Sequence, residues 1–482
     1  MHPKITLTRP IRFWLPLIVL PLLVVGADLL IWQVATPRLA LAMVALGLVA
    51  AAHLLTGPAI GRRAAAMGWG GAMIAALPVI EECQTLSVLF LLAGVVQAAG
   101  WFVAGSSARW ATAVRAGWRL LRQSFVRNCL DLFGFGRAAT QVRLSRANLL
   151  RHWALPILLG LLFVVLFLAA NPLLDRWTMA LANWSPEFAV DYSRIGFGLA
   201  MAGLIWPFLR LDAMRPRLLA PVKPPITLTL PALLLNPGSA LRAMVLFNLI
   251  FAMQTGLDLT YLWGGVSLPE GMSYAIYAHR GAYPLVVTAL LAGGFALLTQ
   301  PFLAGRPVLR WLLLLWTAQN ILLVGSSILR LDLYVDAYGL TRLRFAALVW
   351  MGLVGAGLVL MIWQIHWGKP ITWLLARAGL LGLATLYSCC FINVAGWVAS
   401  HNLARPDQTF DRDYLCSLGE GAVPAIAQAK ATTGETYCRD SNLFIKAPQD
   451  LREWGFRNYR LRKSLAALAA SPQDQTDVRM TP

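Results

Sequence analysis

Charged, aromatic and titratable residues gather beside the ends of long apolar runs in this chain of 482 residues. Ionisable groups at such positions are costly unless they are paired or face water, so they are functional candidates by default. Tyrosine and tryptophan also form ordinary interfacial belts there, and arginine snorkels to the surface, so a purely structural role stays open. The candidate ligand-binding residues are Glu81, Glu82, Asp258, Glu270, Tyr277, His279, Arg280, Arg330, Asp332 and Asp336.

The stretch YAIYAHRGAYPL, residues 274–285, holds the densest group of these side chains. Histidine is the side chain that titrates nearest to neutral pH, and this stretch contains His279. We expect His279 and Arg280 at the rim of a polar cavity at the outer face of a membrane bundle, opposite acidic partners such as Asp258 or Glu270. If Asp258 and Arg330 approach one another across the bundle, they form a neutralised pair that supports this cavity.

Sequence motifs that carry known chemistry are absent. The chain contains no Walker A loop, no HExxH, no CxxC, no GxSxG and no complete GxGxxG motif. It also shows no spacing typical of metal ligands. We therefore expect no cofactor and no metal, leave the catalytic residues unknown, and favour a role that is not enzymatic.

Composition places the chain in a bilayer, because 58% of its residues are hydrophobic and only 13% are charged. Crossing a hydrocarbon core about 30 Å thick takes about 20 helical residues. Eleven apolar runs reach or approach that length: Phe13–Val34, Leu39–Leu55, Met67–Ile80, Thr85–Ala104, Trp153–Ala170, Ile195–Leu209, Leu241–Trp263, Ala282–Leu303, Trp311–Leu329, Phe345–His366 and Ile371–Ser400. The third and sixth runs are short, so each is either extended by a flanking turn or does not fully cross.

These runs predict an all-α fold, a polytopic membrane helix bundle of about 11 transmembrane helices with a small C-terminal extracytoplasmic domain. The first run is longer than a secretory signal core and precedes no clear cleavage site, so we interpret it as an uncleaved helix. The predicted segments are N-terminal transmembrane helices 1–4 (1–104), a basic amphipathic cytoplasmic segment (105–152), transmembrane helices 5–11 (153–400) and an extracytoplasmic C-terminal domain or tail (401–482).

Lysine and arginine are distributed unevenly between the two sets of loops. With a cytoplasmic N-terminus, the inner segments hold 22 of these residues and the outer loops hold 7. This is the positive-inside pattern, which predicts a cytoplasmic N-terminus and an extracytoplasmic C-terminus. Because the formal charge of +19 follows the membrane in this way, we expect no nucleic-acid partner.

The basic segment contains an amphipathic pattern. Trp110, Val114, Trp118, Leu121 and Phe125 recur at spacings of three and four, and arginines project away from that stripe. Such a helix either lies in the headgroup layer on anionic lipid or packs on the inner ends of the bundle. We therefore expect membrane lipids, through anionic headgroups at this segment, as partners, and protein partners are unknown.

The C-terminal residues contain two cysteines, Cys416 and Cys438. In an oxidising compartment a disulfide between them is a candidate, although spacing alone does not establish it. The other four cysteines are scattered and more typical of buried apolar positions. Helical patterning is expected around AVPAIAQAKA and LREWGFRNYRLRKSLAALAA.

Three stretches resemble a known family: YLWGGVSLPEGMSYAIYAHRGAYPLVVTALLAGG (261–294), RLDLYVDAYGLTRLRFAALVWMGLV (330–354) and FINVAGWVASHNLARPDQTFDRDYLCSLGEGAVPAI (391–426). They are similar to the bacterial integral-membrane family catalogued as domain of unknown function 4173, with its relative 4153. The resemblance covers roughly the C-terminal half. It implies a multi-pass protein of the bacterial cytoplasmic (inner) membrane and supplies no catalytic residues.

Three classes of function remain open. The favoured class is a transporter-like or envelope ligand-binding protein with a polar cavity at the outer face, with Asp28, Asp258 and Arg330 lining any pathway. The second is a membrane enzyme acting on a lipid-linked or cell-envelope substrate, with Glu81, Glu82, Glu270 or His279 as acid or base. The third is a regulatory or assembly subunit of a membrane complex.

Overall fold

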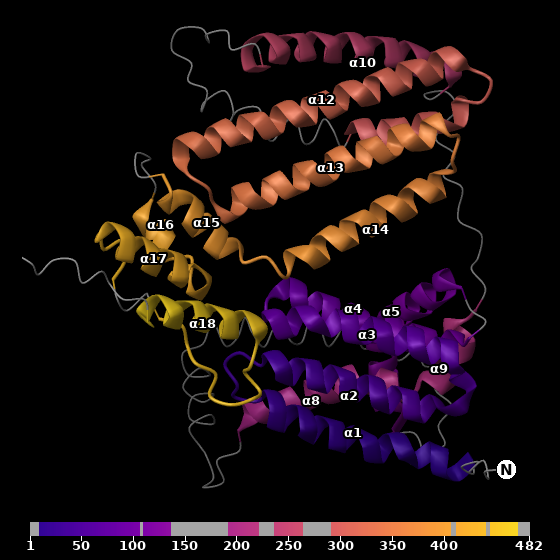
Figure 1. The fold of residues 1–482 in the computed structure, drawn as a ribbon. Coiled ribbons are helices and arrows are strands. Elements are labelled where there is room, and N and C mark those ends of the chain that lie inside the picture. The colour runs from indigo at the N-terminus through magenta and orange to yellow at the C-terminus, as the bar shows by residue number, and fades with distance from the viewer. Residues whose placement is uncertain are drawn as a thin grey trace, which may run out of the picture. The chain divides into compact units, whose positions relative to one another are not determined.

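The structure is a computed structural model that describes residues 9–106, 109–135, 191–220, 236–263, 291–405, 411–439 and 444–470. Helices joined by turns and short connections account for these residues, and no β-strand occurs among them (Figure 1). The predicted all-α class is therefore confirmed for the described ranges. Helix is the expected form, because a backbone inside an apolar medium must satisfy its own N–H and C=O groups.

Seven described helices are long and apolar enough to cross a membrane, so the chain is a membrane protein with several spans. They are α2 (Arg38–Thr56), α3 (Arg62–Glu81), α4 (Thr85–Ala104), α10 (Pro237–Asp258), α12 (Pro307–Tyr338), α13 (Arg342–His366) and α14 (Ile371–Cys389). A shorter apolar segment, Leu15–Ile31, belongs to α1 (Arg9–Ile31). The predicted span Trp153–Ala170 and the first part of Ala282–Leu303 lie outside the described residues, and the count of about 11 is not reached among the rest.

Two predicted spans differ from the observed helices. The short third run is extended by a flanking turn, since α3 begins at Arg62. The prediction of one span from Ile371 to Ser400 is wrong, because α14 ends at Cys389 and α15 (Val394–Leu403) is a separate helix. Asn393 starts α15 as its N-cap, accepting a hydrogen bond of 3.1 Å from the backbone N–H of Gly396.

The chain divides into two compact units, and unit 1 comprises Met1–Leu77 and Leu91–Pro221. Its further helices are α5 (Trp110–Phe135), α8 (Tyr192–Leu209) and α9 (Leu211–Leu218). In this unit α1 packs against α2 and α8, and α5 packs against α8 and α9. The buried core includes Trp101, Phe102, Leu120 and Leu211.

Glycines bring α4 close to its neighbours in unit 1. A Cβ on Gly100 of α4 would lie 2.3 Å from the carbonyl oxygen of Ala113 in α5. A Cβ on Gly68 of α3 would lie 2.5 Å from a ring carbon of Phe102. Small residues at such crossings let helix backbones approach closely, which is how membrane helices gain contact without a hydrophobic driving force between them.

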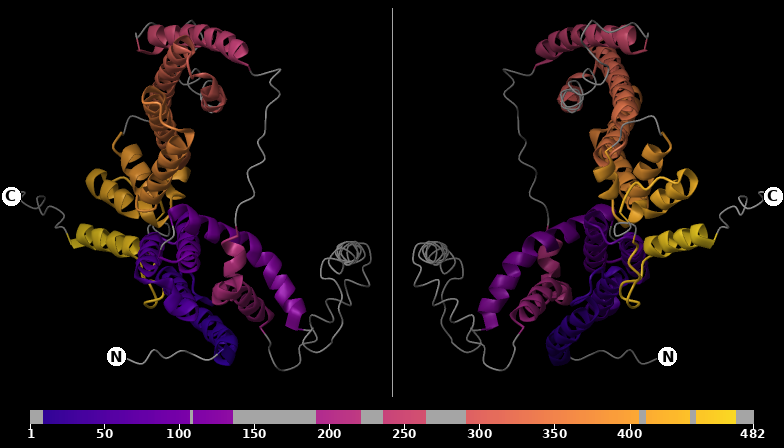
Figure 2. Two further views of the ribbon diagram at one scale, coloured as in Figure 1. Left: turned by 90° about the vertical axis from the view of Figure 1, so that its right-hand side faces the viewer. Right: turned by 90° about the vertical axis from the view of Figure 1, so that its left-hand side faces the viewer.

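Unit 2 comprises Pro78–Phe90 and Val222–Pro482. Within it α12 packs between α10 and α13, and α14 packs on α13, so that these helices follow one another in a row (Figures 1 and 2). Trp316 of α12 joins α10 by ring contacts with Phe247 and Phe251, whose centroids lie 5.4 and 5.6 Å away. Aromatic pairs of this kind add to the apolar packing of the row.

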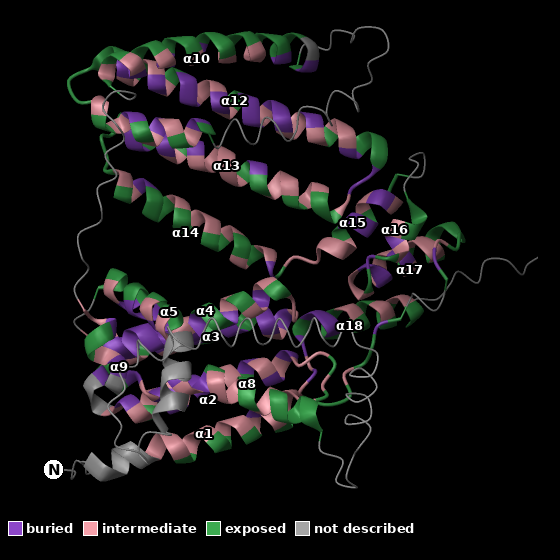
Figure 3. Ribbon diagram, turned by 180° about the vertical axis from the view of Figure 1, so that it is seen from behind, coloured by how far each residue is buried: buried purple, intermediate pink, exposed green. Residues whose placement is uncertain are grey.

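The outer helices of this row bury few of their side chains within the chain. Only 6% of the most apolar stretch of α14, 18 residues long, is buried inside the chain. Leucines such as Leu375, Leu380 and Leu383 are exposed, and the ribbon of α14 is largely exposed or intermediate in Figure 3. Large exposed apolar faces are unusual on soluble proteins. In a membrane protein such faces are covered by lipid or by other membrane helices.

The C-terminal helices form a cluster within unit 2. They are α15, α16 (Arg412–Cys416), α17 (Val423–Thr433) and α18 (Phe456–Ala470). In this cluster α15 and α16 contact the turn between α12 and α13, α17 packs on α15, and α18 packs on α17. The buried side chain of Asn402 accepts a hydrogen bond of 2.7 Å from the N–H of Leu340 and donates one of 3.0 Å to its carbonyl. The helices expected around AVPAIAQAKA and LREWGFRNYRLRKSLAALAA are confirmed, whereas a separate C-terminal domain is not shown.

A disulfide joins the two C-terminal cysteines, Cys416 and Cys438, across 22 residues of sequence. It connects the end of α16 to the segment that follows α17. Crosslinks of this length stabilise small polar regions mainly by restricting the unfolded chain.

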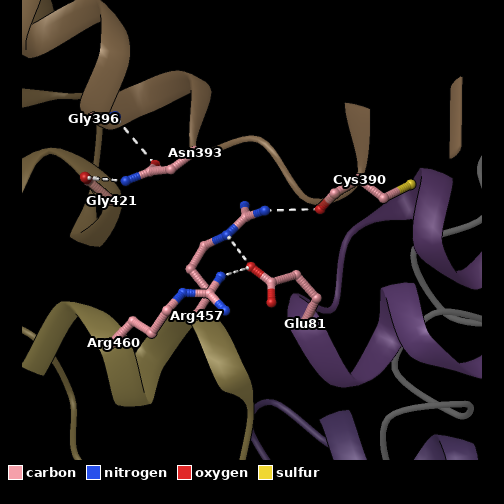
Figure 4. Close-up of polar contacts among 7 residues, drawn as sticks. All are labelled: Glu81, Cys390, Asn393, Gly396, Gly421, Arg457 and Arg460. Carbon is pink, nitrogen blue, oxygen red and sulfur yellow. Dashed lines mark hydrogen bonds and ion pairs between the residues drawn. The ribbon is translucent and has the colours of Figure 1, made fainter. Parts of the chain in front are cut away.

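A buried carboxylate holds α18 in place (Figure 4). Glu81, at the end of α3 and within unit 2, is only 2% exposed. Arg457 of α18 donates from Nε to Glu81 Oε1 at 3.3 Å and from Nη2 to the carbonyl oxygen of Cys390 at 2.7 Å. Arg460 also pairs with Glu81. One carboxylate and one carbonyl therefore fix α18 where α3 and α14 end.

We expect Glu81→Gln to lower the free energy of unfolding by about 3–5 kcal/mol, because it leaves the buried Arg457 charge without its partner. Thermal and denaturant unfolding of the purified protein would measure the loss. The matched control is Glu435→Gln, which removes an exposed partner of Arg412 and should cost less than about 1 kcal/mol. Equal effects of the two substitutions would contradict this account.

Candidate functional site

A cavity of about 680 Å³ opens in unit 2 where α12 ends, α13 begins and α15 crosses them. We call it the α15 pocket. It is lined by Asp332, Val335, Leu340, Phe345, Leu348, Val349, Trp397, Ser400 and His401.

The turn between α12 and α13 sets the shape of the α15 pocket. Gly339 ends α12 with a positive φ of 75°, a conformation that glycine adopts without strain. Thr341 then begins α13 as its N-cap, its Oγ1 accepting from the N–H of Arg344 at 3.2 Å. This short turn brings Val335 of α12 and Phe345 of α13 to one wall of the pocket.

The walls of the α15 pocket are mainly apolar. Val335 and Leu340 are buried in the core that α15 and α17 share with the turn. Trp397 of α15 is 64% exposed and meets Phe345 edge to face, with ring centroids 5.9 Å apart. Concave apolar surfaces with a few polar groups are typical of small-molecule sites.

Two titratable groups face one another across these apolar walls. The carboxylate of Asp332 is exposed and makes no hydrogen bond or ion pair with a described residue. His401 is half-buried, and its Nε2 has no hydrogen-bond partner among the described residues. Burial lowers the pKa of His401 from its ordinary 6.5, and Arg405 lowers it further, while Asp336 and Asp332 act in the opposite direction. At neutral pH the imidazole of His401 in the pocket is therefore uncharged.

Asp336, one helical turn beyond Asp332 on α12, forms an exposed ion pair with Arg405 and does not line the pocket. On the same surface the Arg344 guanidinium lies over the ring of Tyr334, 4.4 Å from its centroid. Of the two predicted carboxylates on this helix, Asp332 alone reaches the α15 pocket.

Asp258 and Arg330 form the pair that their sequence positions suggested. Asp258 ends α10 and is 1% exposed, Arg330 of α12 is 4% exposed, and the two form an ion pair. Gln254 also donates to Asp258 Oδ1 at 2.9 Å. Arg330 lies within a helix, because α12 continues past the expected end of the span at Leu329 as far as Tyr338. Because residues two apart point to different faces of a helix, Arg330 faces α10 while Asp332 lines the pocket.

The remaining predicted residues lie elsewhere. Glu81 docks α18, and Glu82 is half-buried beside it in sequence. Asp28 pairs with Arg194 in unit 1. Glu270, Tyr277, His279 and Arg280, with the whole of YAIYAHRGAYPL, lie outside the described residues. No group of three or more His, Cys, Asp or Glu side chains in the described ranges could hold a metal ion.

Sequence reasoning missed His401 and Trp397 as site residues. Trp397 lies within the predicted span Ile371–Ser400, and His401 is the first residue of the predicted C-terminal segment 401–482. The sequence signal that could have identified them is Asn393, a residue type that often caps helices and that interrupts the apolar run just before α15. It also missed Arg457 and Arg460, whose partner Glu81 is far away in sequence.

Comparison with known proteins gives a family and no activity. The family described as "Domain of unknown function (DUF4153)" matches residues 68–429, which contain the complete lining of the α15 pocket. This is the relative mentioned with 4173 above, and a match to 4173 itself is not shown. No curated protein and no solved structure matches the chain. The chain therefore belongs to the DUF4153 family of proteins of unknown function.

Proposed function

We propose that this membrane protein binds an amphipathic ligand of the bacterial envelope in the α15 pocket and has no enzymatic role. The observation that carries the proposal is the combination of an apolar cavity of about 680 Å³ with Asp332, which lines it and pairs with no residue of the described ranges. An apolar body would contact Val335, Phe345 and Leu348. A head group that donates hydrogen bonds would meet Asp332.

The ligand is best matched by a head group that carries an ammonium or a similar donor. Asp332 attracts positive charge, and the exposed face of Trp397 suits a cation–π contact. The uncharged His401 does not repel a cation at neutral pH. Protonation of His401 would add a positive charge to the pocket and weaken binding of such a ligand.

We place the α15 pocket on the outer side of the bacterial inner membrane, with a cytoplasmic N-terminus and an extracytoplasmic C-terminus. The distribution of lysine and arginine supports this orientation. The Cys416–Cys438 disulfide supports it too, because disulfides persist in oxidising compartments. The pocket then opens towards the envelope.

The basic helix α5 supports a contact with the membrane surface. Trp110, Val114, Trp118 and Leu121 are about half to two-thirds exposed. The opposite face is buried: Ala113 and Leu120 pack in the core of unit 1. The exposed stripe is thus free to enter the headgroup layer, with anionic lipids as partners of the neighbouring arginines.

A transport role is the second candidate, and the Asp258–Arg330 pair is the observation that favours it. Buried charges in membrane helices commonly mark ion or substrate pathways. The pair is followed by a π-helical turn, Leu259–Trp263, whose Trp263 donates to Ser326 Oγ at 3.1 Å. Such turns are frequent at functional sites.

The ligand proposal predicts that a cationic amphiphile protects the α15 pocket. A Ser400→Cys variant lacking the cysteines outside the disulfide would be labelled by a membrane-impermeant maleimide in intact cells. Decyltrimethylammonium should slow labelling several-fold, and decyl sulfate should not. Asp332→Asn should abolish the protection, whereas the matched control Asp336→Asn should retain it, because Asp336 does not line the pocket. Labelling only after the membrane is opened would contradict the outer placement, and equal protection in both aspartate variants would contradict the site.

The lowered pKa of His401 predicts a pH dependence of stability. The unfolded chain binds a proton near pH 6.5, while the folded protein resists it until lower pH, so stability falls as the pH drops below about 6.5. The unfolding temperature measured between pH 7 and pH 5 should fall less in His401→Asn than in the wild type. Asp336→Asn should steepen the fall, because it removes a carboxylate that favours the protonated imidazole. Parallel curves for all three proteins would refute this role of His401.

For the buried pair, we expect Asp258→Asn and Arg330→Gln each to lower the free energy of unfolding by about 3–5 kcal/mol, because each leaves one buried charge alone. The double variant Asp258→Leu/Arg330→Met should recover most of the loss, as thermal unfolding would show.

A transport role for the buried pair makes a separate prediction. Wild-type proteoliposomes should move decyltrimethylammonium across the bilayer, and the stable double variant should not. Absence of movement by the wild type would remove the transport candidate and leave the pair structural.

A further inference from the structure

A second cavity, of about 420 Å³, lies at the end of α12 and α13 opposite to the α15 pocket. We call it the arginine pocket. Its lining is Leu303, Gly305, Arg306, Pro307, Arg310, Trp311, Leu314 and His366. It is formed by the turn before α12, the first turns of α12 and the last residue of α13.

Two arginines give the arginine pocket its charge. Arg306 donates from Nη1 to the carbonyl oxygen of Phe302 at 3.0 Å, and Arg310 donates from Nη2 to the carbonyl oxygen of His366. Neither forms an ion pair with a described carboxylate. A guanidinium has five N–H donors, so each arginine keeps several donors and its full charge for a bound group.

The start of α12 adds to this positive potential. Arg306 is its N-cap residue and makes no side-chain cap hydrogen bond, and Pro307 occupies the first turn. The first backbone N–H groups of a helix point out of its N-terminus, where the helix dipole favours anions. No acidic residue lies in the first turn to occupy that position. An anion with several oxygen acceptors therefore fits the pocket.

Exposed tryptophans place the arginine pocket at a membrane interface. Trp311 is 69% exposed, and Trp363 and Trp367 of the neighbouring α13 end are 55% and 62% exposed. Indole rings gather at the level of lipid head groups. An apolar stripe starts at the same point, since Val308, Trp311 and Leu315 are exposed and recur at helical spacing. A lipid, which has both a phosphate and an acyl chain, matches these two surfaces together.

We propose that the arginine pocket binds the phosphate of an anionic phospholipid, with Arg306 and Arg310 donating to its oxygens. The stripe of Val308, Trp311 and Leu315 contacts an acyl chain of the same lipid. The site is distinct from the α15 pocket and does not depend on the function proposed for it.

Binding of short-chain lipids to the purified protein in mild detergent tests the site. Dioctanoyl phosphatidylglycerol should bind the wild type more tightly than dioctanoyl phosphatidylcholine. The Arg306→Gln/Arg310→Gln variant should bind phosphatidylglycerol roughly 30-fold more weakly, because each of the two basic residues contributes about 1 kcal/mol near anionic lipid and about 1.4 kcal/mol is tenfold in affinity. Arg242→Gln is the matched control: Arg242 is an exposed arginine near the start of α10 that does not line the pocket, so its loss should leave binding unchanged.

Two further measurements keep the test decisive. Arg306→Gln alone changes an exposed side chain, so it should fold normally and show an intermediate loss of lipid binding. Equal binding of phosphatidylglycerol by the double variant and the wild type would overturn the site. Competition by inorganic phosphate at concentrations similar to those of the lipid would overturn the lipid as its occupant, because the acyl stripe would then contribute nothing.

Discussion

Every charge buried in an apolar bundle needs a partner supplied by the chain itself, and this constraint governs the described structure of unit 2. Taking an unpaired charge out of water costs several kcal/mol, whereas a charge with a partner and further hydrogen bonds is tolerated. Asp258 meets Arg330 between α10 and α12, and Glu81 meets Arg457 where α3 and α14 end. The first pair joins α10 to α12, and the second joins α18 to the last residues of α3, which belong to unit 2. The α15 pocket follows from the same rule applied to the backbone, because Asn402 satisfies both polar groups of Leu340 and so holds α15 against the turn.

Hydropathy predicts the elements whose polarity changes sharply at their ends. The expected span Thr85–Ala104 coincides with α4, because charged or polar residues lie close to it at both ends. Hydropathy fails where a helix ends inside an apolar run, or where a charged residue at the end of such a run still belongs to the helix. Asn393 sits inside an apolar run and still starts a new helix, because its side chain caps α15. Arg330 ends an apolar run and still lies inside α12, because Asp258 neutralises it.

The candidate site could be predicted only in part for a related reason. The residue type of Asp332 was enough to make it a candidate ligand-binding residue. A pair of Asp258 and Arg330 could be suggested from sequence, because both residues are charged and lie in or beside apolar runs. His401 was missed because it follows the long apolar run Ile371–Ser400, whose division into α14 and α15 the hydropathy pattern does not reveal. The contact between Glu81 and Arg457 joins residues 376 positions apart. No periodicity within one sequence specifies a contact at that separation, which depends on the packing of all the helices between them.

The length and charges of α12 connect the two pockets. Its 32 residues span about 48 Å at a rise of about 1.5 Å per residue, well beyond a hydrocarbon core about 30 Å thick. The helix is therefore longer than the apolar layer is thick. Arg306 and Arg310 lie at its N-terminus and Asp332 and Asp336 near its C-terminus, so the side chains at each end have the same sign as the helix dipole there.

That arrangement is unfavourable by about 0.3–1 kcal/mol for a charge in the first or last turn, and by less for Asp332, which lies further inside α12. Stability of the helix alone therefore does not select it. Near the C-terminus the chain offsets it in part, since Arg405 pairs with Asp336 and Arg344 donates to the carbonyl oxygen of Tyr338 at 2.9 Å. Asp332 has no ion-pair partner among the described residues. The two arginines at the N-terminus donate to backbone carbonyl oxygens and form no ion pair with a described carboxylate. A cation at one end and an anion at the other would complete the charge balance of α12, which is the physical reason to seek a ligand at each of its two pockets.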